Sequence, residues 1–144
     1  MEKQQSFKNH ARIVPMYHMG VFFPLVINLF WAMYRIYQGV TGESIVGLLV
    51  AVALLLMFFS VRLQILTVQD RVIRLEMRLR LRERLPPDLQ AAVASLTLSQ
   101  LIALRFASDA EMPELVRAVV SGQLPTSKDI KMRVKDWQAD HLRA

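Results

Sequence analysis

The 144-residue sequence contains no cysteine, five glycines and only three histidines. Without cysteine there can be no disulfide, iron–sulfur cluster or thiolate metal site. His10, His18 and His141 are too few and too scattered for a dense metal cluster. Glycine loops for phosphate, nucleophile elbows and H-E-x-x-H zinc motifs are also missing. We therefore predict no catalytic residue, no metal site, no cofactor and no enzymatic activity.

The hydrophobic residues are unevenly distributed along the chain. They make up 53% of the sequence, which nonetheless carries a formal net charge of +6. Most of them lie in the first half, whereas most of the charges follow residue 60. A soluble protein mixes the two kinds of residue more evenly, so this division predicts a membrane segment followed by a water-facing segment.

Two long runs of the sequence, 16–34 and 45–61, carry no formal charge. Arginines flank them, and a bilayer core needs roughly 20 helical residues while flanking arginines can reach the headgroups. A buried core helix and a cleaved signal peptide are the rival interpretations. However, so short a chain has too little protein to cover two helices that are apolar all round, and no small-x-small cleavage pattern follows the first run. We therefore predict two transmembrane helices.

The segment between the two runs predicts a tight hairpin. Gly39 is expected to end the first helix in the left-handed conformation, and Thr41 or Ser44 to cap the second. Pro24 is expected to bend the first helix by removing a backbone donor. A connection this short makes the two helices antiparallel neighbours.

The distribution of lysine and arginine predicts the orientation. The N-terminal arm and the stretch after the second run are rich in both residues, while the connection has only Arg35 at its edge. By the positive-inside rule, both termini are cytoplasmic and the hairpin tip is outside. The predicted location is a bacterial inner (plasma) membrane, crossed twice.

Three residues inside the spans are predicted to join the two helices. Asn28 lies near the middle of the first run, where an unpaired amide is costly, so we expect it to bond across to another helix. A substrate or ion site is the minor alternative. Gly47 and Ala51 form a small-xxx-small step that allows close approach of a second backbone.

The second span is predicted to continue as one helix through Leu85, forming a basic cytoplasmic stalk. Apolar residues follow it at alternating spacings of three and four, typical of an a/d seam: Phe58, Val61, Ile65, Val68, Val72, Leu75 and Leu79. We call the last four, Val68 to Leu79, the seam. A second apolar line, Leu66, Ile73 and Met77, lies nearly opposite. A helix with two apolar faces is expected to pack on two things, its own C-terminal domain and either a second copy or a foreign subunit.

Four arginines form a flank beside the seam: Arg71, Arg74, Arg78 and Arg82. This arginine flank is predicted to be a solvated face, a contact for anionic lipid headgroups or a docking surface for an acidic partner. Favourable pairs four residues apart are expected for Asp70 with Arg74 and for Glu76 with Arg80. Nucleic acid is an unlikely ligand because no aromatic residue interleaves with the arginines.

Beyond Pro86 the chain predicts a small bundle of short helices. Asp88, Ser99, Asp109 and Thr126 or Ser127 are expected near the helix starts, and the last helix should present Ile130, Val134, Trp137 and Leu142 on its apolar face. A bundle of this size is marginal alone and should lean on the stalk. A helix-turn-helix reader formed by the last helix is a weaker alternative, because acidic residues dilute its lysines.

A cofactor contact would have to use the aromatic and histidine side chains of the first span. His18, Tyr17 and Trp31 are the weak candidates for contacting a haem, pigment or quinone. A lone interfacial histidine more often contacts a headgroup or the backbone, so no cofactor is predicted.

The two ends of the sequence together resemble a bacterial family of two-span membrane proteins of unknown function. The most specific elements are Asn9-His10-x-Arg12 near the start and Asp136-Trp137-Gln138 near the end, and the resemblance covers essentially the whole chain. It implies a membrane protein with the layout described here and implies no activity.

The leading hypothesis is a non-catalytic interaction protein, an accessory or assembly subunit of a larger membrane complex, or a protein that self-associates through the stalk. The alternatives are a membrane-anchored cytoplasmic regulator binding anionic lipid or nucleic acid, and a pigment- or quinone-contacting subunit of an electron-transfer complex. The predicted fold is all-α, with this organisation: N-terminal arm 1–15, transmembrane helix 16–38, external loop 39–44, transmembrane helix and stalk 45–85, and cytoplasmic helical domain 86–144.

Overall fold

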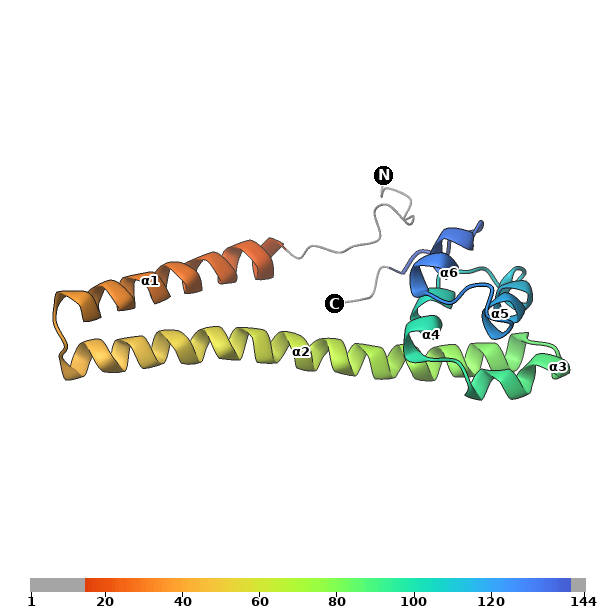
Figure 1. Ribbon diagram of the computed structural model, residues 1–144, viewed down its shortest axis with the longest axis horizontal. Helices are drawn as coiled ribbons and strands as arrows, with labels where there is room; N and C mark the ends of the chain where they lie inside the picture. Colours follow the sequence, from red (N-terminus) through yellow and green to blue (C-terminus); the bar gives the residue numbers. More distant parts are fainter. Residues whose placement is uncertain (1–14, 141–144) are drawn as a thin grey trace. The chain divides into compact units, whose positions relative to one another are not determined.

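The computed structural model describes residues 15–140 and confirms the all-α prediction. Those residues form two compact units: a hairpin unit, residues 15–66, and a stalk unit, residues 67–140. One long helix, α2 (Gly42–Arg84), contributes to both units, as Figure 1 shows. The predicted N-terminal arm, including Asn9, His10 and Arg12, lies outside the described residues, as do His141 and Leu142.

The first predicted span is helical over its predicted length but begins with a wider turn. A π-helix, η1 (Met16–Val21), leads directly into α1 (Phe22–Gln38). Pro24 lacks the N–H that would bond to the carbonyl of Gly20, and its ring crowds that carbonyl in a regular helix. The π-helix ends three residues before Pro24, and the bend predicted at Pro24 stays a prediction.

The hairpin turn is shorter than predicted, because α2 begins at Gly42 rather than at residue 45. Thr41 caps it: its Oγ1 accepts from the Ser44 amide at 3.1 Å, and Ser44 Oγ accepts from the Thr41 amide at 2.9 Å. Gly39 is extended, with φ 169°. The left-handed conformation predicted for it is wrong, since its carbonyl is instead held by the Ser44 hydroxyl at 3.1 Å.

The hairpin helices pack through small residues at one end and aromatic rings at the other. Ala32 and Ala51 are buried, the latter completely. Near the ends of the spans, Tyr17 stacks on Phe58 with ring centroids 4.1 Å apart, and its hydroxyl donates to the Phe58 carbonyl at 2.9 Å. Most other large apolar residues of this unit are exposed, so its outer surface is almost entirely hydrophobic.

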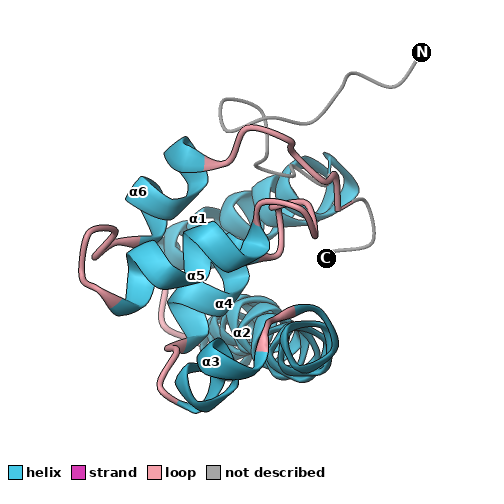
Figure 2. Cartoon of the chain, turned by 90° about the vertical axis from the view of Figure 1, so that its right-hand side faces the viewer, coloured by secondary structure: helices cyan, strands magenta, loops and turns pink. Residues whose placement is uncertain are grey.

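Four short α-helices and one 3-10 turn complete the stalk unit. They are α3 (Pro87–Gln90), η2 (Ala91–Ala94), α4 (Leu98–Leu104), α5 (Met112–Val120) and α6 (Ser127–Arg133). Figure 2 labels the α-helices. Thr97 and Thr126 close capping boxes on α4 and α6, so the predicted Ser99 cap is wrong and the Thr126 alternative is confirmed. Gly122, with φ +79°, follows α5 in the left-handed conformation that favours glycine.

Trp137 does not belong to the last helix, which ends at Arg133. The chain turns extended at Val134 and returns beside Ala107, with which Trp137 forms an isolated β-bridge. Its ring stacks on the buried Phe106 ring, with centroids 4.5 Å apart. Trp137 therefore fastens the end of the described chain to the bundle instead of forming part of a helix face.

Candidate functional site

The stalk part of α2 has two apolar faces, and its own C-terminal helices cover only one of them. At about 100° per residue, Ile73, Met77 and Leu81 lie about half a turn from the middle of the seam. They are 5%, 3% and 0% exposed. We call these three residues, with Leu85, the back face.

The back face is the floor of the bundle's hydrophobic core. Buried residues from every short helix belong to the same cluster as the back face, including Leu89, Val93, Leu101, Leu104, Met112, Val116 and Ile130. The stalk unit thus buries one side of its long helix internally, as predicted for a bundle too small to stand alone.

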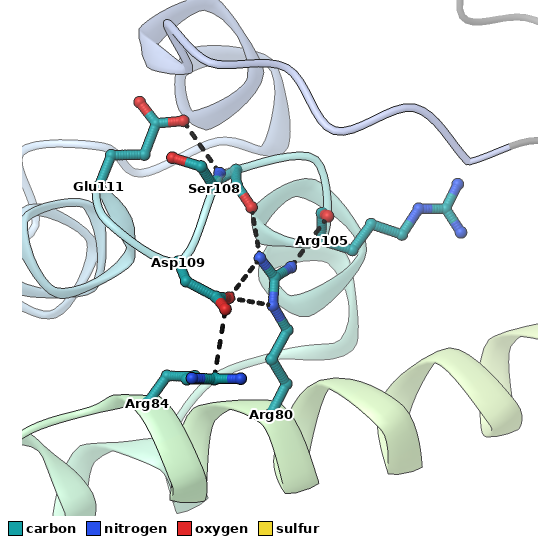
Figure 3. Close-up of polar contacts among 7 residues, drawn as sticks. Arg80, Arg84, Arg105, Ser108, Asp109 and Glu111 are labelled. Atoms are coloured by element: carbon teal, nitrogen blue, oxygen red, sulfur yellow. Dashed lines mark hydrogen bonds and ion pairs between the residues drawn. The ribbon is translucent and has the colours of Figure 1, made fainter.

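A polar cluster centred on Asp109 fixes the bundle on the back face (Figure 3). Arg80 donates from Nε to Asp109 Oδ1 at 2.8 Å, and its terminal nitrogens donate to the carbonyls of Arg105 at 3.2 Å and Ala107 at 2.7 Å. Arg84 approaches the other carboxylate oxygen at 3.2 Å. Arg80 was predicted to pair with Glu76 on its own helix; that prediction is wrong, because a planar guanidinium satisfies three acceptors at once here.

The seam has no covering element within the stalk unit. Val68, Val72, Leu75 and Leu79 are 60%, 48%, 62% and 53% exposed. Scattered exposed apolar residues are ordinary, but a continuous exposed stripe along a helix indicates a contact surface. The seam is therefore the candidate functional site.

Charges of opposite sign border the seam. Arg71 and Arg78 lie along one edge, and Glu76 and Glu83 along the other, each roughly 50–90° from the middle of the seam. All four side chains are exposed, and the ion pairs among residues 15–140 include none of them. The acidic edge was missed from the sequence because Glu76 was assigned to Arg80.

The arginine flank is fully on the surface, since Arg71, Arg74, Arg78 and Arg82 are all exposed. Within the described chain, no ion pair joins Asp70 to Arg74. A small hollow of about 210 Å³ lies beside the flank, and its lining residues are Thr67, Asp70, Arg71, Arg74 and Leu98. The flank is thus available to an external acidic group.

The weak cofactor candidates separate into two places. Tyr17 and His18 meet edge to face, with ring centroids 5.2 Å apart, and line an apolar pocket of about 260 Å³ together with Phe22, Phe58, Phe59 and Arg62. The guanidinium of Arg62 lies 5.7 Å from the Tyr17 ring centroid. Trp31 lies about 20 Å further along α1 and contacts Tyr34, so it does not join the other two.

The three residues predicted to join the spans behave differently. Ala51 is completely buried, whereas Asn28 lies on the exposed side of α1. A Cβ added at Gly47 would meet nothing within 4 Å, so the second helix does not approach closely there. Within one hairpin, therefore, Asn28 and Gly47 are not interhelical contacts, and any partner of Asn28 would come from outside it.

The last helix, the alternative candidate for a nucleic-acid reader, is short. It has only seven residues, and two of its basic side chains are engaged within the bundle. Lys131 lies 5.6 Å from the Phe106 ring centroid, and Arg133 pairs with Glu114 at 3.8 Å. Over residues 15–140, no group of three or more histidine, aspartate or glutamate side chains is arranged to hold a metal ion.

Comparison with known proteins identifies a family but no activity. A family model described as a family of unknown function (DUF6526) matches residues 1–144. No curated protein and no solved structure matches the sequence. The resemblance to a family of unknown function is thus confirmed over the whole chain.

Proposed function

Because the chain belongs to DUF6526, a family of unknown function, we propose its role from its own surfaces: it is a non-catalytic membrane interaction protein. It acts as an accessory or assembly subunit that is anchored by the hairpin and presents the seam to a protein partner. The observation that carries this proposal is the uncovered seam on a helix whose opposite face is fully buried.

The exposure of the two long helices supports membrane anchoring. Both Met16–Gln38 and Gly42–Arg84 are long and apolar enough to span a bilayer, and only 6% and 11% of their most apolar stretches are buried. A core helix of a soluble protein has most of its surface covered by other elements. Apolar surface this extensive is stable only in lipid, where it costs no hydration.

The charge distribution favours an orientation with the stalk unit in the cytoplasm. Arginines are frequent from Arg62 onward, and the turn between the helices carries no basic residue beyond Arg35. The seam and the arginine flank then face the cytoplasm close to the inner (plasma) membrane. Anionic headgroups are second partners of the flank, since its four exposed guanidinium groups, which form no ion pair among residues 15–140, attract them.

The state of the carboxylates supports a structural role over acid–base chemistry. Asp88, Asp109, Glu114 and Asp140 each pair with an arginine inside the stalk unit. A general acid or base needs a carboxyl group free to exchange its proton with a substrate. These four are instead used to hold short helices together.

The proposal is tested by the size of the assembly extracted from native membranes in mild detergent. Wild-type protein is expected in a complex larger than one chain, and the variant with Val68→Ser, Val72→Ser and Leu75→Ser as a single chain. The matched control is Val120→Ser with Met132→Ser, two exposed apolar residues away from the seam. A seam variant that retains the wild-type size would refute the proposal.

The same extraction identifies the alternative. If the seam variant keeps its size but detergent-solubilised wild-type protein retains less added anionic lipid as salt rises, the arginine flank is the functional surface, because screening weakens headgroup contacts. Trp137 fluorescence in a Trp31→Phe background reports that each variant keeps its bundle, since the Trp137 ring stacks on Phe106.

A further inference from the structure

The stalk helix has the residue pattern of a two-stranded coiled coil. Val68 and Leu75 occupy d positions, and Val72 and Leu79 occupy a positions, of one continuous heptad register. A β-branched residue at a followed by leucine at d, as at Val72 and Leu75, favours two strands. The exposure of all four side chains means that the a/d stripe lacks a partner among residues 15–140.

The edge charges fit one arrangement of two identical stalks. In this register Arg71 and Arg78 are at g, and Glu76 and Glu83 are at e. In a parallel coiled coil each g residue faces the e residue five positions later in the other strand. Arg71 then meets Glu76 of the other copy, and Arg78 meets Glu83. By symmetry the dimer gains each contact twice.

The antiparallel arrangement is disfavoured by the same charges. There, g residues face g residues and e residues face e residues, so arginines would meet arginines and glutamates would meet glutamates. Like charges at these positions repel. Two copies anchored in one membrane with one orientation also extend their stalks in the same direction, which agrees with the parallel arrangement.

The C-terminal bundle occupies the positions that such a dimer leaves outside. Ile73, Met77 and Leu81 lie at b, f and c, the outer positions of the heptad, and they are covered by the bundle of the same chain. Between Val68 and Glu83 the bundle therefore leaves a, d, e and g open to a second strand, and it covers a g position only at Leu85, beyond that stretch.

We propose, resting on the function proposed above, that the partner on the seam is a second copy of this chain, joined as a parallel, in-register, two-stranded coiled coil. The apolar a/d stretch from Val68 to Leu79 is shorter than two heptads, because Arg82 takes the next d position, and free coiled coils generally need three or four heptads. Confinement of both copies to one membrane raises their effective concentration and compensates for this short length.

The absence of cysteine makes disulfide trapping a clean test. Val68→Cys and Leu75→Cys are made singly in the full chain and oxidised in native membranes. Disulfides need Cα atoms within about 7 Å, which a parallel pair meets at both d positions. We expect each variant to link to itself at least about tenfold more than Arg74→Cys, at the outer c position, does. An antiparallel pair can link at one of the two positions at most.

Charge reversal tests the electrostatic part of the proposal. Glu76→Lys with Glu83→Lys makes both edges basic, and Arg71→Glu with Arg78→Glu makes both edges acidic. Each reversed chain alone, trapped through Leu75→Cys, should give about tenfold less dimer, because four attractive contacts become repulsive. When the two are produced together, mixed dimers should return to the wild-type level.

The outcomes separate this inference from the proposed function. One outcome is that the Val68→Ser, Val72→Ser, Leu75→Ser variant is extracted as a single chain while the single-cysteine variants form no disulfide-linked dimer. The seam then binds a different protein, and the proposal that its partner is a second copy of this chain is refuted. If the same serine variant keeps the complex, both proposals fail. If both cysteines link but charge reversal changes nothing, the parallel, charge-matched register is refuted.

Discussion

The two apolar faces of the stalk helix have similar composition and opposite surroundings. Leu81 on the back face is completely buried, while Leu79, two residues away, is 53% exposed. The arginines beside the two faces differ in the same way. Arg80 is held by Asp109 and two carbonyls of its own chain, whereas no described ion pair includes Arg78. Apolar periodicity therefore identifies both faces. What distinguishes the face that packs within the chain from the exposed face is whether the neighbouring arginines are paired within the chain.

The largest expected difference between the faces is in the stability of the bundle. Leu81→Ala should lower its free energy of unfolding by about 2–5 kcal/mol, because it leaves a cavity in the core. Leu79→Ala should change it by less than about 0.5 kcal/mol, as for an ordinary surface position. Denaturant unfolding in detergent, followed by Trp137 emission in the Trp31→Phe background, measures both. Equal losses would mean that the two faces are not distinct.

The arginines give a smaller difference of the same kind. Arg80→Ala should cost about 1–2 kcal/mol of bundle stability, since it removes bonds to Asp109 and to two carbonyls, one partner being partly exposed. Arg78→Ala should leave bundle stability unchanged and weaken self-association instead. The same unfolding measurement, together with disulfide trapping through Leu75→Cys, checks the two effects. A matching loss of stability for Arg78→Ala would count against this division.

The smallest expected effect concerns the helix that covers the back face. Thr97→Ala should destabilise the bundle by about 1 kcal/mol, because it removes the capping box that begins α4. Ser99→Ala, in the first turn but outside the capping box, should change stability by less than about 0.5 kcal/mol. The same emission assay measures this pair. A larger loss of stability for Ser99→Ala than for Thr97→Ala would mean that Ser99 is the cap.

The sequence allowed the long elements of the fold to be predicted, because uninterrupted apolar runs and sustained periodicity have few alternative structures. Local details were less predictable. Ser99 and Thr97 are both acceptable caps by residue type, and only Gln100, three residues after Thr97, completes the capping box. Gly39 was assigned a left-handed conformation from its type alone, whereas a hydrogen bond from Ser44 keeps it extended. The cap of a helix and the conformation of a turn glycine depend on hydrogen bonds to nearby residues, which apolar periodicity does not reveal.

The candidate site was only half visible in the sequence. The seam and the arginine flank follow from spacing along one helix, and the prediction of two packing partners rested on that spacing. The sequence does not predict that Arg80 pairs with Asp109 beside the back face, because the two residues are 29 positions apart and meet only through tertiary packing. Because Arg80 pairs with Asp109, it does not pair with Glu76. The acidic edge of the seam therefore depends on the contact between Arg80 and Asp109.

The most direct test of the central claim is the accessibility of the seam in native membranes. Val72 and Val120 are 48% and 50% exposed in the single chain, so single Val72→Cys and Val120→Cys variants should react equally with a maleimide if the seam is bare. If the seam is an occupied interface, Val72→Cys should react far more slowly than Val120→Cys in native membranes, and equally fast once denaturant separates the chains. Equal reactivity in native membranes would contradict the account.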